Sequence, residues 1–180
     1  MAPNPGQRPM SATLVYYNQN AQAFFADTVD VDMSALHDRF LATLSAGGLV
    51  LDAGCGSGRD VRAFLERDSR VCAFDASSAL AQLTATYTGL AVVIRTFAEV
   101  CEQSCYDGIW ACASLLHLPE ADIPAARARL WATLKPGGTF YMSFSQPTLQ
   151  YCAIVELWLF VDTMIVNTSP GPGRPVASGA

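Results

Sequence analysis

The stretch LVLDAGCGSGRD, residues 49–60, decides the fold of this chain. Its apolar start, LVL, predicts a strand buried on both faces, and Asp52 ends that run. Glycines then stand at alternate positions, so the backbone can turn sharply and approach a ligand without interference from Cβ atoms. After Gly58 the residues RDVRAFLERD have the period of a helix, with an apolar face made by Val61, Phe64 and Leu65. Strand, glycine turn and helix N-terminus together predict a nucleotide-type site at the carboxyl edge of a parallel sheet.

The spacing of the glycines and the charge before them indicate the kind of ligand. A dinucleotide-binding turn is usually GxGxxG, and the helix N-terminus then holds a pyrophosphate. Here the pattern is GxGxG, formed by Gly54, Gly56 and Gly58, and the Asp52 carboxylate precedes it. A carboxylate at that place would repel a phosphate and attract a cationic ligand. The same pattern also fits a tight βα turn that binds nothing.

Composition limits the classes of protein and partner. The chain has 180 residues, of which 51% are hydrophobic and 15% charged, with a net charge of −5. These values predict one globular domain with a real core, and no basic patch points to a nucleic-acid partner. The start of the chain carries no signal-peptide pattern, and the apolar run at 151–166 is too short and too charged to span a membrane.

Six cysteines occur without a CxxC spacing. We therefore expect free, mostly buried thiols in a reducing cytoplasm, and neither a disulfide framework nor a metal site. Several of them fall in predicted strands or at the glycine turn, including Cys55, Cys72 and Cys112.

Two helices are expected before the glycine strand. Residues 1–12 read as a loose leader, and the segment 14–27 has a helical period. A second helix is predicted over 33–44, with Asp32 as its cap. Tyr17 on the first helix either contacts a ligand in the glycine site or packs against the sheet.

A second carboxylate ends the next predicted strand, RVCAFD, residues 70–75. It follows the glycine turn by about twenty residues, where a carboxylate can accept hydrogen bonds from both hydroxyls of a ribose. Asp75 could instead cap the helix that starts near Ser77 and ends at Gly89. Because Ser77 and Ser78 can cap that helix themselves, we expect Asp75 to be free for the ribose.

The segment AVVIRT, residues 91–96, predicts a third buried strand. In the loop after it, Phe97 can stack on or flank a base, and the Ala98 N–H can bond to the edge of that base. Glu99 is the acid in this loop, and it lies late for a contact with an adenine amino group.

The segment YDGIWACASLLHLPE, residues 106–120, predicts the fourth strand and its exit loop. Ala111 and Cys112 lie at the carboxyl end, where ligands bind in open α/β sheets, so their backbone groups can line the site. His117 is the residue here whose pKa suits proton transfer at neutral pH, and it can equally pack in the turn before Pro119. No catalytic residue is therefore assigned.

A helix is predicted over 123–134, with an inner face formed by Ala126, Leu130, Trp131 and Leu134. It ends at KPGG, residues 135–138, because Pro136 cannot continue a helix and the glycines reverse the chain. The fifth strand, TFYMSF, follows at 139–144.

Four segments stand in the order found in class I S-adenosylmethionine-dependent methyltransferases: LDAGCGSGRD, AFDASSAL, YDGIWACASLLHLP and LKPGGTFYMSF. The chain resembles that family over residues 13–146, and most closely the small bacterial tellurite-resistance-type enzymes. The resemblance implies a doubly wound, mostly parallel α/β sheet of the Rossmann-like methyltransferase fold, with the first two helices as a partial lid.

The resemblance also implies S-adenosylmethionine (SAM) as cofactor. It places Asp52 near the methionine amino group, the turn 54–58 with Cys55 around the cofactor, and Asp75, followed by Ala76, on the ribose. Arg59 is placed to meet an anionic group of cofactor or substrate, unless it is a solvated helix residue.

The resemblance fades after Phe144, where the family continues with a helix and two more strands. Residues 147–180 form an atypical tail, expected to be disordered from about 167. The sheet is therefore expected to lack one or both of the last strands. An unpaired edge on the fifth strand would then invite self-association.

These observations predict SAM-dependent methyl transfer to a small-molecule acceptor. Two alternatives are a SAM-binding protein without turnover, because of the shortened C-terminus, and a nicotinamide-dependent oxidoreductase. The second fits poorly with the GxGxG turn and with the acid at Asp52.

Overall fold

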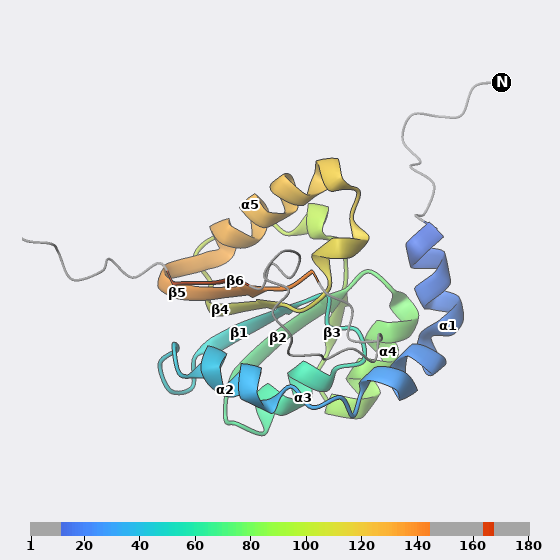
Figure 1. The fold of residues 1–180 in the computed structure, drawn as a ribbon, viewed down its shortest axis with the longest axis horizontal. Coiled ribbons are helices and arrows are strands. Elements are labelled where there is room, and N and C mark those ends of the chain that lie inside the picture. The colour runs from blue at the N-terminus through green and yellow to red at the C-terminus, as the bar shows by residue number, and fades with distance from the viewer. Residues whose placement is uncertain (1–11, 145–163, 168–180) are drawn as a thin grey trace, which may run out of the picture.

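The computed structural model describes residues 12–144 and 164–167, and over these residues the chain forms a six-stranded sheet of order β3-β2-β1-β4-β5-β6 (Figure 1). The first five strands run parallel, and the last is antiparallel to its neighbour. Their bounds are β1 Leu49–Ala53, β2 Arg70–Asp75, β3 Val92–Ile94, β4 Tyr106–Ala111, β5 Leu134–Met142 and β6 Met164–Asn167.

Helices cover both faces of this sheet (Figure 1). On one face lie α2 (Ser34–Leu41), α3 (Arg59–Leu65) and α4 (Ser78–Thr88), and on the other lies α5 (Ile123–Thr133). The chain steps outward from β1 to β3 through α3 and α4, then returns to β4 and steps the opposite way to β5 through α5. Right-handed crossovers in opposite directions place their helices on opposite faces, which is the doubly wound arrangement predicted from the sequence.

Side chains of successive strand residues enter two separate cores, because neighbouring residues of a strand point to opposite faces. Leu51, Ile109 and Phe140 pack on the α5 side. Their neighbours Val50, Trp110 and Tyr141 pack on the side of α2 and α3. The Trp110 and Tyr141 rings stack with centroids 3.7 Å apart. The central strands are thus buried on both faces, as their apolar sequences predict.

The first helix, α1 (Ala12–Thr28), lies against α4 at the edge of the molecule (Figure 1). Asn18 of α1 holds this contact: its Oδ1 accepts hydrogen bonds from the Ser77 hydroxyl at 2.7 Å and from the Ala79 N–H at 3.3 Å. The predicted helix at 14–27 is therefore confirmed. The predicted helix at 33–44 is shorter than expected, and Asp32 accepts from the Ser34 N–H at its start.

Three expectations about the sheet and its helices were wrong. The predicted buried strand at 91–96 is a three-residue edge strand in which Val93 is 54% and Ile94 55% exposed. Trp131, expected on the inner face of α5, is 44% exposed. Strand β5 begins at Leu134, so KPGG lies within it, and the pairing with β4 is irregular there.

The edge of the fifth strand is not unpaired. Residues 139–142 of β5 pair with β6 in antiparallel register. The sheet was expected to lack one or both of the last strands, and β6 excludes the loss of both. The expected self-association through this edge therefore loses its basis. The leader before residue 12, and the tail apart from β6, lie outside the described residues.

Among the described cysteines only Cys55 is buried, and Cys101 and Cys105 are exposed, so the expectation of mostly buried thiols was wrong. All five described cysteines are free. Within residues 12–144 and 164–167, no helix has the length and hydropathy needed to cross a membrane.

Candidate functional site

The glycine turn after β1 is tied to the tip of β2. The N–H groups of Gly54 and Cys55 donate to the Phe74 carbonyl at 2.9 and 3.0 Å. The Gly56 N–H donates to Asp75 Oδ2 at 2.9 Å. These bonds hold the turn at the carboxyl edge of the sheet, over the ends of β1 and β2. Strand β1 also pairs with β4, and the strand order reverses between these two, which is where open α/β folds bind ligands.

Two positions in this turn require glycine. Gly54 has φ +81°, and a Cβ there would lie 2.6 Å from the Ser114 Cβ. Gly58 has φ +78°, and its Cβ would lie 2.6 Å from Thr84 Cγ2. Backbone conformation and close contact therefore both explain the spacing seen in the sequence.

Asp75 ends β2, as predicted, but its carboxylate is not free. One oxygen accepts from Gly56, and the other accepts from the Ser77 N–H at 2.8 Å. Ser77 itself caps α4 by accepting from the Leu80 N–H. Burial raises the pKa of Asp75, and the hydrogen bonds from Ser77 and Gly56 oppose this rise. Each oxygen can accept a further bond, so the carboxylate can still meet a ligand.

Asp52 lies in β1 and is only 1% exposed. Its Oδ2 has no hydrogen-bond partner. Burial raises the pKa of Asp52 well above its usual range, repulsion from Asp60 adds to the rise, and the Arg59 charge opposes it. A buried acceptor without a donor is unfavourable, so this carboxyl is suited to receive a donor or a cation from a ligand.

Asp60, at the start of α3, is the residue that the sequence analysis missed. Its carboxylate accepts from His37 Nε2 at 2.8 Å, from Trp110 Nε1 at 2.9 Å, and from Arg59 Nε and Nη2 at 2.8 and 2.9 Å. Burial alone would raise the pKa of Asp60, but the hydrogen bonds from His37 and Arg59 and the Arg59 charge hold it below its usual range. We call these four side chains the Asp60 cluster.

Arg59 is therefore not a solvated helix residue. Its side chain is 12% exposed and is paired with Asp60, while its Nη2 lies 3.7 Å from the Cys112 sulfur. Burial would lower the pKa of Arg59, but the bonds to Asp60 and its charge raise it.

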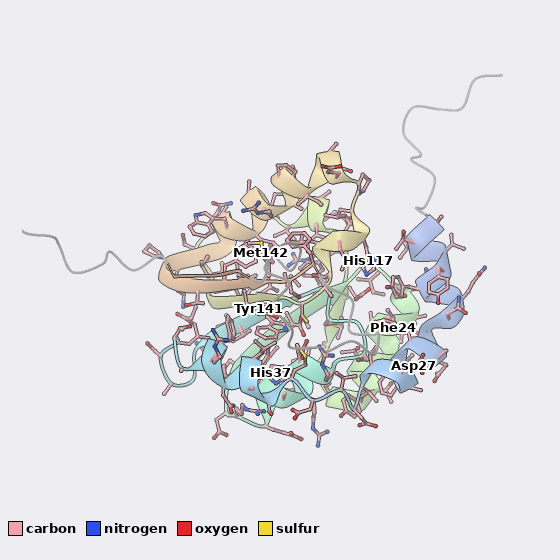
Figure 2. The ribbon with its side chains drawn as sticks, viewed as in Figure 1. Phe24, Asp27, His37, His117, Tyr141 and Met142 are labelled. Atoms are coloured by element: carbon pink, nitrogen blue, oxygen red, sulfur yellow. The ribbon has the colours of Figure 1, made fainter. Side chains whose placement is uncertain are left out.

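Helix α1 covers the glycine turn from outside the sheet. Phe24 Cε1 lies 3.2 Å from the place where a Gly56 Cβ would stand. The Tyr17 ring packs edge-on against Phe24, and its hydroxyl lies 3.0 Å from His117 Nε2. Figure 2 shows Phe24 and His117 together beside α1, away from His37 and Tyr141. His117 follows Ser114 in a short 3₁₀ helix, η2 (Leu115–His117).

The structure brings Phe97 to the same turn. Its Cζ lies 3.6 Å from the Cβ position of Gly54, and its ring packs edge-on against Phe74. Ala98 is exposed beside it. Glu99, which lay late for an adenine contact, accepts from the Thr96 N–H and hydroxyl instead, both at 2.8 Å.

The predicted residues after β4 are also at this edge. Ala111 is buried, and Cys112 follows it. Burial, with repulsion from Asp60, raises the pKa of the Cys112 thiol to about 11. The thiol is therefore protonated near neutral pH and is a weak nucleophile. Ala76, directly after Asp75, completes the predicted set at the tip of β2.

One cavity lies beyond the end of α1, and another lies along it. One of about 290 Å³ lies between the α1–α2 linker and α3, and His37 and Arg59 are among its lining residues. The other, of about 550 Å³, lies between α1 and α4 and is lined partly by Asn18. Neither lining includes Asp75 or the glycine turn, which Phe24 covers.

Comparison with known proteins agrees with this geometry. A methyltransferase domain family matches residues 50–138. The structure of 1,6-didemethyltoxoflavin-N1-methyltransferase from Burkholderia thailandensis, with bound 1,6-didemethyltoxoflavin and S-adenosylhomocysteine, is 30% identical. The match covers 77% of this chain and 67% of that one, with a TM-score of 0.55.

Two further structures share the fold at lower identity. A TehB-like SAM-dependent methyltransferase from Corynebacterium glutamicum is 20% identical over 77% of this chain and 76% of that one, with a TM-score of 0.59. The N-methyltransferase NodS from Bradyrhizobium japonicum, with S-adenosylhomocysteine, is 16% identical over 70% and 71%, with a TM-score of 0.58. Other structures with this fold are longer, and the chain spans 44% to 62% of their length. Comparison with curated proteins gave no match.

The parallel sheet, its glycine turn and the two carboxylates at neighbouring strand tips define the class I SAM-dependent methyltransferases. The chain belongs to the methyltransferase domain family. The residues present fit the cofactor of that class, because the unpaired oxygen of Asp52 is an acceptor suited to a cationic ligand.

Proposed function

We propose that this protein transfers the methyl group of SAM to a small-molecule acceptor. The observation that carries the proposal is the buried, unpaired Asp52 oxygen beside a glycine-rich turn. SAM carries an ammonium and a sulfonium and no phosphate, so it suits this acidic turn. A dinucleotide would bring two phosphates toward the same carboxyl groups, and this disfavours the oxidoreductase alternative.

The proposed cofactor contacts follow the position of each residue along the sheet edge. Asp52 meets the methionine ammonium, and Asp75, with Ala76, meets the ribose hydroxyls. The adenine lies against Phe97 and the Ala98 N–H. The methionine portion follows the backbone of the remaining predicted residues, which are Gly54, Cys55, Gly56, Gly58, Ala111 and Cys112.

Two further residues are assigned by their partners. Arg59 already neutralises Asp60 and reaches Cys112, so we propose that it faces the methionine carboxylate with one edge of its guanidinium. Tyr17 closes the site from α1 through its contact with Phe24. Phe24 lies directly on Gly56, so its ring forms the α1 side of the proposed site.

When bound, SAM supplies a methyl group made electrophilic by the sulfonium. The protein has to align the acceptor with that methyl group and keep water away from both, so proximity and orientation provide most of the rate increase. Helix α1 excludes water on one side, through Tyr17 and Phe24. The rigid backbone bonds between the turn and β2 fix the other side.

A small-molecule acceptor is supported by the relative from Burkholderia thailandensis, whose structure contains bound 1,6-didemethyltoxoflavin. We further propose that the chain belongs with the tellurite-resistance-type enzymes, on the order of its four motifs. A cytoplasmic location is proposed from its free cysteines.

Titration calorimetry with SAM tests the cofactor assignment, using Asp75→Asn and the control Asp27→Asn. Asp27 is an exposed carboxylate on α1, so its removal changes the net charge equally. We expect Asp75→Asn to weaken SAM binding by about 10-fold or more, because a buried hydrogen bond to a charged group is lost. The control should bind as the wild type does. Equal affinity of all three proteins would remove the ribose assignment.

Methyl transfer is tested by release of S-adenosylhomocysteine in the presence of a panel of phenols, thiols and amines. The proposal predicts acceptor-dependent release. Tight SAM binding without release for any acceptor would favour a binding protein without turnover.

A further inference from the structure

A tyrosine and a histidine meet at the rim of the glycine turn, although they are 100 residues apart in sequence. Tyr17 Oη lies 3.0 Å from His117 Nε2, and the two rings meet edge-on with centroids 5.1 Å apart. One of these groups donates a hydrogen bond to the other, because a phenol and an imidazole can each act as donor or acceptor. The contact joins α1 to the loop after β4.

The surroundings place this pair next to the proposed methyl donor. Tyr17 packs on Phe24, which lies on Gly56. The 3₁₀ helix that carries His117 begins one residue after Ser114, whose Cβ abuts Gly54. Both partners thus lie close to the turn, and both side chains are only partly buried.

Both groups are neutral in this environment. Burial lowers the pKa of His117, so the imidazole is unprotonated at neutral pH. Burial raises the pKa of Tyr17, and the nearby Tyr16 and Asp75 raise it further. These two groups, on α1 and at the tip of β2, are those that act on the pair electrostatically. A neutral imidazole with a hydrogen-bonded phenol is ready to accept a proton.

We propose that Tyr17 and His117 together accept the proton of an acceptor whose nucleophilic atom carries hydrogen. The bond from that atom to the methyl carbon forms as the carbon–sulfur bond breaks, and the bonding electrons go to sulfur. The acceptor proton passes to Tyr17 Oη as the phenolic proton passes to His117 Nε2, which leaves methylated product, a neutral thioether and an imidazolium. Tyr17 is then a catalytic residue, because it touches the acceptor. His117 holds the proton that Tyr17 passes on.

The other titratable groups of the site are less suited to this role. Asp60 already accepts four hydrogen bonds, and His37 is one of its donors. The Cys112 thiol has its pKa raised to about 11, and Asp75 is bonded through both oxygens. The inference rests on the proposed function, since it needs SAM in the turn.

The test compares Tyr17→Phe and His117→Asn with Tyr16→Phe. Tyr16 is the exposed neighbour of Tyr17, so its variant removes the same hydroxyl without touching His117. SAM affinity is measured first, and initial rates are then measured with two probes at mildly alkaline pH. Catechol must lose a proton when it is methylated, whereas thiophenol is already an anion.

We expect Tyr17→Phe and His117→Asn to lower kcat with catechol by about 10²-fold or more, the usual contribution of a general base. Their loss of kcat with thiophenol should be far smaller than their loss with catechol, because the nucleophile has no proton to lose. With catechol, the wild-type rate should also rise with pH through the lowered pKa of His117, and this rise should be absent in His117→Asn.

Equal losses with both probes would overturn the proposal and leave the pair a structural contact. Unchanged rates in both variants would overturn it as well. Failure of the wild type to bind SAM would instead refute the proposed function, so the two failures can be told apart.

Discussion

Two buried carboxyl groups flank the glycine turn, and their surroundings are opposite. Asp60, after the turn, accepts four hydrogen bonds from three side chains of the chain itself. Asp52, before the turn, leaves Oδ2 without a partner. Accordingly the pKa of Asp60 is lowered, against the effect of burial, whereas burial raises the pKa of Asp52.

The difference separates a structural carboxylate from a binding one. The Asp60 cluster ties α2, α3 and β4 together, so its charge is neutralised within the fold. Asp52 gives the fold nothing that an uncharged residue could not give. Its unpaired oxygen makes physical sense if a cationic ligand supplies the missing partner.

The largest effect should follow from breaking the Asp60 cluster. Asp60→Asn leaves the buried Arg59 charge without its partner, and we expect the free energy of unfolding to fall by about 3–5 kcal/mol. Urea unfolding measures this change. The control Glu66→Gln removes an exposed ion pair with Arg62 and should change stability by less than about 1 kcal/mol. If Asp60→Asn and Glu66→Gln unfold with similar free energies, Asp60 is not a structural carboxylate.

A smaller loss is expected at the turn between the two carboxyl groups. Gly54→Ala combines a left-handed backbone with a contact at 2.6 Å, and the expected destabilisation is about 2–4 kcal/mol. Gly47→Ala is a matched control, because it has φ +68° and open space around its Cβ position. Thermal unfolding of the two variants isolates the contact with Ser114. If Gly47→Ala is as unstable as Gly54→Ala, that contact is unimportant.

Removing the charge of Asp52 should affect binding more than folding. We expect Asp52→Asn to weaken SAM binding by about 10–100-fold, which is about 1.4–2.8 kcal/mol, with unfolding free energy at least as high as that of the wild type. Asp107→Asn is the control at the opposite edge of the sheet, where Asp107 bonds to Leu49 and Lys135. It should lose stability and keep its SAM affinity. If Asp52→Asn instead lost stability and kept its SAM affinity, while Asp107→Asn lost SAM affinity, Asp52 would be structural and the assignment would be wrong.

The smallest effect is a dependence of stability on pH. A carboxyl with a raised pKa contributes stability that is fully present below its unfolded pKa, about 3.9, and is lost as pH rises through the folded value. Asp60 behaves oppositely, since its lowered pKa contributes stability above about 3.9 that is lost in acid. The free energy of unfolding of Asp52→Asn, measured with urea, should therefore increase relative to that of the wild type as pH rises from about 4 to 7. A constant difference across this range would mean that Asp52 does not titrate there.

Local patterns were enough to predict the central part of the fold. Strand β2 has the predicted bounds, and Ser77 and Gly89 begin and end α4 as their types suggest. The glycine turn was also predicted. The backbone conformation at Gly54 and Gly58 needs glycine, so the turn is visible in the sequence as a glycine pattern.

The predictions of burial and contact were wrong or missing where they depend on residues that are distant in sequence. The apolar residues of β3 resemble a central strand, but the strand order places them at an edge. Trp131 follows the buried Leu130 and is turned away from the sheet by one helical step. The contact between Tyr17 and His117 joins positions 100 residues apart, which no local pattern predicts.

Asp60 could have been found from the sequence. It precedes Val61 and lies one helical turn before Phe64, so it shares the buried face of α3. An acid at such a position requires buried donors. That requirement predicts a cluster like the one formed with His37 and Trp110.

Thermal unfolding with SAM, S-adenosylhomocysteine or NAD tests most directly whether the acidic turn binds a cationic nucleoside. A ligand that binds only the folded protein raises its melting temperature, by several degrees at concentrations well above Kd. The account predicts such a rise with SAM and S-adenosylhomocysteine and none with NAD. A rise with NAD alone, or with none of the three, would contradict it.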